Sequence, residues 1–104
     1  MFDQVVLDAI QQHAIRCYPE ECCGLVTRDG YQPFPNIHPE PTQYFRLPPE
    51  ADAMVAAGEA LAVVHSHPNG PDWPSAADQQ QQINQGIPWG ICVVRPGRAE
   101  TPYF

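Results

Sequence analysis

The sequence is poor in basic residues and has no basic run. Five Lys and Arg residues stand against twelve Asp and Glu, so the formal net charge is -7. Nucleic acids and anionic membranes bind through clusters of positive charge, and neither is an expected partner. No apolar run approaches the roughly 20 residues of a membrane span, and no basic segment followed by an apolar stretch opens the chain. We therefore expect a soluble, unexported protein with no membrane span, located in the cytoplasm.

The four cysteines, Cys17, Cys22, Cys23 and Cys92, form no C-x-x-C pair. Cys22 and Cys23 are neighbours and would point to opposite faces of a strand. A disulfide framework requires a secretory context, which is missing here. We interpret the cysteines as small buried hydrophobic residues, with a second metal site or a thiol nucleophile as the alternatives.

The length of 104 residues predicts a single domain over 1–104, with an α+β layout. Capping signals at Asp3, Pro49 and Gly86 mark helix ends. Alternating or continuous apolar runs between turn residues mark strands. In chain order we expect a helix over 2–16, a hairpin of strands 22–27 and 31–37, a short strand 44–47, a helix over 49–60, a strand 61–66, a helix over 75–84 and a closing hairpin of strands 89–94 and 99–104.

The segment His65-Ser66-His67-Pro68 carries the strongest chemical signal. Two imidazoles at i and i+2 project from the same face of a strand, and the apolar residues 61–64 before them predict one. Asp78, eleven residues after the second histidine, can supply a carboxylate as a third ligand. Two nitrogens and one carboxylate leave the fourth position of a tetrahedral zinc ion to water, as in catalytic zinc sites. This pattern indicates a hydrolase.

Ser75 and Asp78 also fit a helix capping box, Ser-x-x-Asp, without any metal. That interpretation does not account for the two histidines upstream. The two interpretations are compatible, because a helix can hold its first residues in place while they face a metal ion.

A hydrolytic site needs a general base near the bound water. Glu20 and Glu21 are the carboxylates that adjoin a predicted core strand. An acidic pair at this position could equally belong to a surface loop. The residues alone do not decide between these alternatives.

Three motifs together resemble those of the JAMM (MPN-plus) zinc metallopeptidases. They are Glu21-Cys22-Cys23-Gly24, His65-Ser66-His67-Pro68 and Ser75-Ala76-Ala77-Asp78, each in the expected order and spacing. The resemblance covers nearly the whole chain and implies a cytidine-deaminase-like fold, a curved mixed β-sheet flanked by helices. It also implies one zinc ion bound by His65, His67 and Asp78, with Glu21 activating water and Ser75 assisting the oxyanion.

The resemblance implies hydrolysis of a peptide or isopeptide bond in a peptide or protein substrate. The phrase Tyr18-Pro19-Glu20-Glu21-Cys22-Cys23-Gly24-Leu25 looks most like the phage and prophage branch, the amino-terminal domain of the K-type tail assembly proteins. Phage tail proteins are then possible partners, and the location would be virion-associated. Longer members of that branch continue into an NlpC/P60-type cysteine peptidase domain, which does not lie within residues 1–104.

Other functions remain open at this stage. Free-standing bacterial JAMM proteins that process ubiquitin-like sulfur carriers are the closest rival. A binding module, or a structural zinc that stabilises a tail-tip assembly, would need no turnover. The substrate, the oligomeric state and the surroundings of this chain in a longer one are not determined by the sequence. The loop 71–74 with Trp73 is either one wall of a groove or a stiff surface turn.

Overall fold

A computed structural model describes residues 2–104. The elements are α1 (Gln4–Cys17), β1 (Cys23–Thr27), β2 (Gly30–Phe34), α2 (Pro49–Ala56), β3 (Ala60–Pro68), α3 (Ala76–Gln85), β4 (Trp89–Arg95) and β5 (Arg98–Ala99). The strands form one sheet in the order β2-β1-β3-β4-β5. Only β3 and β4 pair in parallel, and α3 makes the crossover between them. The predicted α+β fold with a mixed sheet is confirmed.

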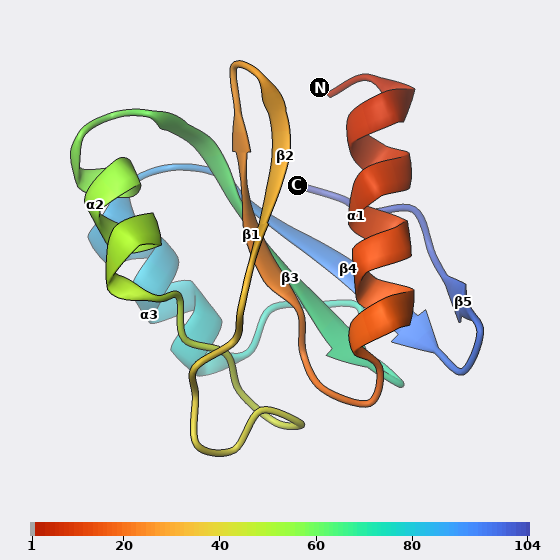
Figure 1. The fold of residues 1–104 in the computed structure, drawn as a ribbon. Coiled ribbons are helices and arrows are strands. Elements are labelled where there is room, and N and C mark those ends of the chain that lie inside the picture. Colours follow the sequence, from red (N-terminus) through yellow and green to blue (C-terminus); the bar gives the residue numbers. More distant parts are fainter. Residues whose placement is uncertain (1) are drawn as a thin grey trace.

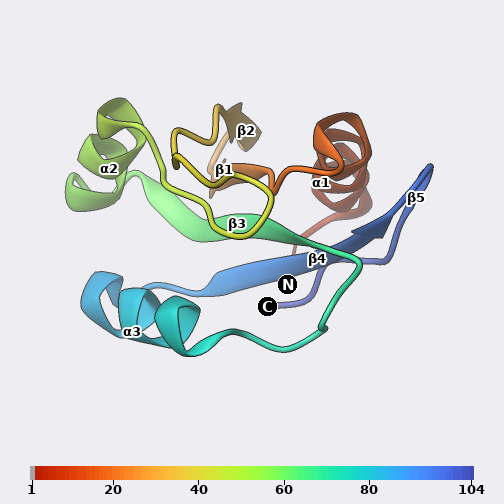
Figure 2. The same cartoon turned by 90° about the horizontal axis from the view of Figure 1, so that it is seen from below.

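Helices cover both sides of the curled sheet. Figures 1 and 2 show α1 on one side and α2 and α3 on the other. Side chains alternate accordingly, because successive strand residues point to opposite faces. Cys22, Val26 and Val64 pack with α1, whereas Cys23, Leu25 and Val63 pack with α2.

The first helix forms as its sequence predicts. The Asp3 side chain accepts a hydrogen bond from the Val6 N–H and caps the helix. The apolar residues Val6, Ile10 and Ala14 recur on one face and are buried against the sheet.

Gly24 has a steric reason to be glycine. The ring of Tyr31, from the adjacent strand β2, lies over it so closely that a Cβ at position 24 would collide with the ring and its hydroxyl. The Tyr31 hydroxyl also contacts His13 of α1, with its oxygen 2.6 Å from the Nδ1 atom of His13. The glycine of the first motif therefore serves packing between the sheet and α1.

The expected strand over 44–47 is wrong: this segment has no strand partner. Two of its backbone groups bond to a side chain instead, since the Asn36 amide accepts from the Arg46 N–H and donates to the Tyr44 carbonyl. One backbone hydrogen bond, from Ile37 N–H to Arg46 carbonyl, does not make a ladder.

Three further boundaries differ from the expectation. Strand β2 ends at Phe34 rather than at 37. Helix α2 ends at Ala56 rather than near 60, because Gly58 takes a left-handed conformation and the Glu59 and Gly58 N–H groups bond back to Met54 and Val55. The closing strand is limited to Arg98–Ala99 with an isolated bridge between Ile91 and Tyr103, since Pro102 has no N–H to offer a ladder.

The cysteines behave as small hydrophobic residues. Cys22, Cys23 and Cys92 are buried, Cys17 is half-buried, and all four are free thiols. Burial raises the pKa of Cys23 and that of Cys92 to about 12, which disfavours a thiolate nucleophile at either position. Within residues 2–104, no helix has the length and apolar character of a membrane span.

The buried His13 should make the stability of the fold depend on pH in the acid range. Burial, assisted by the nearby Arg16 charge, lowers its pKa to about 4. The unfolded chain thus takes up a proton near pH 6.5 that the folded chain takes up only near pH 4. The contribution of neutral His13 to the free energy of unfolding is fully present above pH 6.5, and it is lost progressively as the pH falls from 6.5 toward 4.

We expect wild-type protein to lose about 1–2 kcal/mol more than His13→Gln between pH 8 and pH 5, after allowance for partial solvation. Denaturant unfolding at both pH values measures this difference. Because the other histidines are common to both proteins, an equal loss in the two would show that His13 does not carry the effect.

Candidate metal centre

His65 and His67 lie within β3, on the face of the sheet away from α1. The strand extends to Pro68, past the expected end at 66, and pairs His65 with Ile91 and His67 with Val93. Both imidazoles are buried, and their Nε2 atoms are 3.0 Å apart. The pairing of β3 with β4 thus holds the two rings on one face of the sheet, as the i, i+2 spacing predicts.

Asp78, in the first turn of α3, joins this pair. Its Oδ2 atom is 3.1 Å from the Nε2 of His65 and 3.1 Å from that of His67. The same oxygen accepts from the Ser75 N–H, and the Ser75 hydroxyl accepts from the Asp78 N–H, both at 3.0 Å. The capping box exists, and it orients the carboxylate toward the histidines.

The Nε2 atoms of His65 and His67 and the Oδ2 atom of Asp78 form a nearly equilateral triangle with sides of 3.0–3.1 Å. The Nδ1 of His67 lies 2.8 Å from the Pro71 carbonyl, so it carries the proton and leaves Nε2 as a lone pair. In the neutral ring a bare Nε2 and a carboxylate oxygen 3.1 Å apart repel, so a proton or a metal cation must lie with them. In tetrahedral zinc sites with bonds of about 2.0–2.1 Å, neighbouring ligand atoms are about 3.3 Å apart. The donor set and its spacing fit such an ion.

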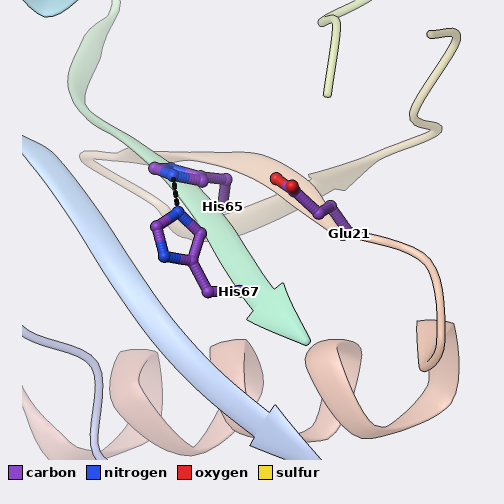
Figure 3. Close-up of side chains that lie close together, drawn as sticks. All are labelled: Glu21, His65 and His67. Carbon is purple, nitrogen blue, oxygen red and sulfur yellow. Dashed lines mark hydrogen bonds between the residues drawn. The ribbon is translucent and has the colours of Figure 1, made fainter. Parts of the chain in front are cut away.

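Glu21 lies beside this triangle, directly before β1. Figure 3 shows its carboxylate directed toward the two imidazoles. One carboxylate oxygen lies within 4.8 Å of a nitrogen of each ring, and the residue is buried. Glu21 and Asp78 therefore compete as third ligand to His65 and His67. The Oδ2 atom of Asp78 lies 3.1 Å from both Nε2 atoms, whereas Glu21 forms no hydrogen bond with either ring, which favours Asp78 as the third ligand and Glu21 as its neighbour.

Burial and mutual contact shift the pKa values in the site. Burial raises the pKa of Glu21 to about 8, against the opposing charge of His67. Burial also lowers the pKa of His65. For Asp78, burial opposes ionisation, but the contacts with both histidines and the Ser75 N–H outweigh it and hold the pKa far below the usual range. For His67, burial is likewise outweighed, by Asp78, the Pro71 carbonyl and Glu21, so its pKa is raised.

Two aromatic rings enclose His65. Phe45 stacks on its imidazole at 4.6 Å between ring centroids, and Trp89 meets it edge-on at 5.4 Å. The Nδ1 of His65 is buried with no hydrogen-bond partner among the described residues. Packing, rather than a polar contact on Nδ1, therefore orients this ring. Sequence reasoning did not identify Phe45, and its position in a loop gave no periodic signal.

A cavity of about 570 Å³ opens over the site. Glu21, His67, Ser75 and Asp78 lie on its lining. The loop between β2 and α2 forms one wall, and the start of α3 with the loop before it forms another, including Gly70 and Pro71. The exposed Trp73 does not line it, so the groove wall that loop 71–74 could form comes from Pro71 alone.

Known proteins match the chain over most of its length. Tail tip assembly protein K of Escherichia phage N15 is 41% identical over 93 residues, which are 85% of this chain and 38% of that protein. A probable TtuB-protein conjugate cleaving protease of Thermus thermophilus is 34% identical, with 70% of this chain and 56% of that protein covered. Desampylase of Haloferax volcanii is 31% identical, with 71% and 63% covered. The chain thus spans less than two thirds of each of these relatives.

The fold is shared with solved structures. The solution structure of a protein from Salinibacter ruber matches with a TM-score of 0.61 and 29% identity, covering 96% of this chain and 76% of that one. A model of the family of prokaryotic homologues of the JAB domain matches residues 3–102. With the site geometry and these relatives in agreement, the chain belongs to the family of prokaryotic JAB-domain homologues.

Proposed function

We propose that this protein is a zinc-dependent hydrolase of peptide or isopeptide bonds. The observation that carries the proposal is the convergence of two imidazole nitrogens and one carboxylate oxygen within 3.0–3.1 Å of one another beside a cavity that His67 and Asp78 line. Relatives named as a conjugate cleaving protease and a desampylase support a hydrolase.

His65, His67 and Asp78 would hold one zinc ion per chain. When bound, zinc would supply Lewis-acid activation of water and of the scissile carbonyl. Glu21, buried beside the ligands and outside the closest triangle, is the group that takes the proton from water and returns it to the leaving amine.

Ser75 is the proposed donor to the oxyanion. Its hydroxyl oxygen accepts from the Asp78 N–H, which leaves the O–H free to donate into the cavity that Ser75 lines. A fixed donor aimed at developing charge needs no reorganisation during the reaction. The capping box holds Ser75 in place for that role.

The biological setting that we propose is tail assembly in a phage or prophage, or attack on the cell wall by a tail. The match to tail tip assembly protein K over 85% of the chain supports it. Processing of ubiquitin-like sulfur carriers is the second candidate, favoured by the matches to the Thermus and Haloferax proteins. A zinc-stabilised binding module without turnover is the third, and activity separates it from the other two.

Metal content is the first test. Purified protein should contain about one zinc per chain, and His65→Ala with His67→Ala should remove it, because both imidazoles are lost from the closest triangle. Asp78→Asn should weaken zinc binding, whereas Glu21→Gln should not. Elemental analysis and zinc titration against a chelator measure both effects. His38→Ala is the matched control, since His38 lines the same cavity but lies outside the triangle. Unchanged zinc in the double variant would contradict the ligand assignment.

The role of Glu21 is tested by Glu21→Gln, with Glu20→Gln as its exposed neighbour and control. We expect Glu21→Gln to keep zinc and fold but to lower kcat by roughly 10²-fold or more, because the amide does not take up the proton. Two fluorogenic substrates, one with an α-peptide bond and one with a lysine isopeptide bond, also distinguish the bond that is cleaved. Full activity in Glu21→Gln would assign the base elsewhere.

Ser75→Asn separates the capping and catalytic roles of Ser75. Asparagine is a good N-cap, so we expect thermal stability close to wild type, whereas Ser75→Ala should lose about 0.5–2 kcal/mol. The change of donor geometry should lower kcat on the order of 10²-fold. Melting curves and kcat are measured side by side on the same zinc-loaded samples. A stable and fully active Ser75→Asn would leave Ser75 as a helix cap only.

A further inference from the structure

Asn36, which belongs to none of the three motifs, makes more hydrogen bonds near the site than the catalytic side chains do. Its Nδ2 donates to the carbonyl of Glu21 at 3.0 Å and to that of Tyr44 at 2.9 Å, with a longer contact of 3.4 Å to Pro41. Its Oδ1 accepts from the N–H groups of His38 and Arg46, both at 3.0 Å. The donor and the acceptor of the Asn36 amide are therefore both engaged.

These contacts define the orientation of the amide. Nδ2 faces three carbonyl oxygens and Oδ1 faces two N–H groups, so exchanging the two atoms would set donors against donors and acceptors against acceptors. Nδ2 has two hydrogens, and the two shortest contacts, to Glu21 and Tyr44, use them. The side chain of Asn36 therefore connects the Glu21 backbone to the loop that closes the cavity.

The strand register explains why these two residues meet. In the β1–β2 hairpin Cys23 pairs with Phe34, so Glu21 and Asn36 lie opposite each other two residues beyond the end of the ladder. In the β1–β3 pair Cys23 pairs with His65, so on its other side Glu21 lies opposite His67. Backbone pairing has ended at Asn36, and its side chain takes over the contact to Glu21.

The same loop makes a second contact to Glu21 and one to His65. The Glu21 N–H donates to the Pro41 carbonyl at 2.7 Å. Phe45 lies between Tyr44 and Arg46, which both bond to Asn36, and its ring stacks on His65. Loss of the Asn36 amide would thus remove the bond to the Glu21 carbonyl and loosen the loop that brings Pro41 to the Glu21 N–H and Phe45 to His65.

We propose that Asn36 is a positioning residue: its side-chain amide fixes Glu21 beside the metal ligands and orders loop 36–46 as a wall of the cavity. The kinetic part of this inference rests on the proposed hydrolase function, and the structural part does not. Groups that orient the residues around a metal typically change activity by 10- to 100-fold when they are removed.

Two substitutions distinguish the donor role of the Asn36 amide from its acceptor role. Asn36→Leu has similar volume and removes both halves. Asn36→Asp keeps the acceptor for His38 and Arg46 but replaces the donor to Glu21 and Tyr44 with an oxygen. The control is Thr27→Val, which removes two hydrogen bonds from the turn at the far end of the same hairpin, to Gly30 and from Asp29.

Amide hydrogen exchange, followed by NMR, tests the structural part without any substrate. In Asn36→Leu we expect the N–H groups of Glu21, His38 and Arg46 to exchange at least 10-fold faster than in wild type. In Thr27→Val these three amides should exchange as in wild type. Unchanged exchange in Asn36→Leu would overturn the proposal.

Kinetics on zinc-loaded protein with the isopeptide substrate tests the positioning of Glu21. Asn36→Asp should retain about one zinc per chain and lower kcat by about 10–100-fold with KM changed less than 3-fold. Thr27→Val should keep the kcat of wild type even if its melting temperature falls as much as that of Asn36→Asp, or more. An unchanged kcat in Asn36→Asp would reduce Asn36 to a structural residue and overturn the proposal. If wild type has no turnover, the proposed function fails, and exchange at Glu21 alone decides for or against Asn36.

Discussion

The register of β1 against β3 is the constraint on which the site depends. Cys22 and Ser66 are joined twice, by the Ser66 N–H to the Cys22 carbonyl at 3.0 Å and by the Cys22 N–H to the Ser66 hydroxyl at 2.7 Å. Because side chains alternate, this pair faces α1 while Glu21 and His67 face the cavity. A slip of one residue would turn Glu21 away from the histidines. The buried Ser66 between the two histidines therefore holds the first motif to the second.

The position of Asp78 beside the two histidines follows from the parallel pairing of β3 with β4. Parallel neighbours require a crossover, and here α3 supplies it. The helix must begin beyond the end of β3 that carries His67, so its first turn reaches the histidines. A capping carboxylate at that position is already held by the Ser75 N–H. The same oxygen of Asp78 thus caps the helix and meets both histidines, as the proposed ligand role requires.

Local patterns predicted those parts of the site that local geometry determines. The facing of His65 and His67 follows from strand alternation, and the Ser75–Asp78 cap follows from helix-end chemistry. The contributions of Phe45 and Asn36 could not be predicted in this way. Each acts from a loop whose shape is determined by long-range hydrogen bonds. The segment Tyr44-Phe45-Arg46-Leu47 suggested a strand, but the Asn36 side-chain amide bonds to its backbone where a partner strand was expected. The end of α2 was predictable, since Gly58 is a typical residue beyond a helix C-terminus.

Charge balance explains why such a site is stable only with cations. With Glu21 and Asp78 ionised and both imidazoles neutral, four buried residues would carry two negative charges in a low dielectric. Without a metal ion, protons must supply the compensation, which agrees with the raised pKa values of Glu21 and His67. A divalent cation at the triangle would supply both positive charges at one point and leave Glu21 ionised as a base. The burial that makes two negative charges here costly is therefore the property that favours a metal ion there.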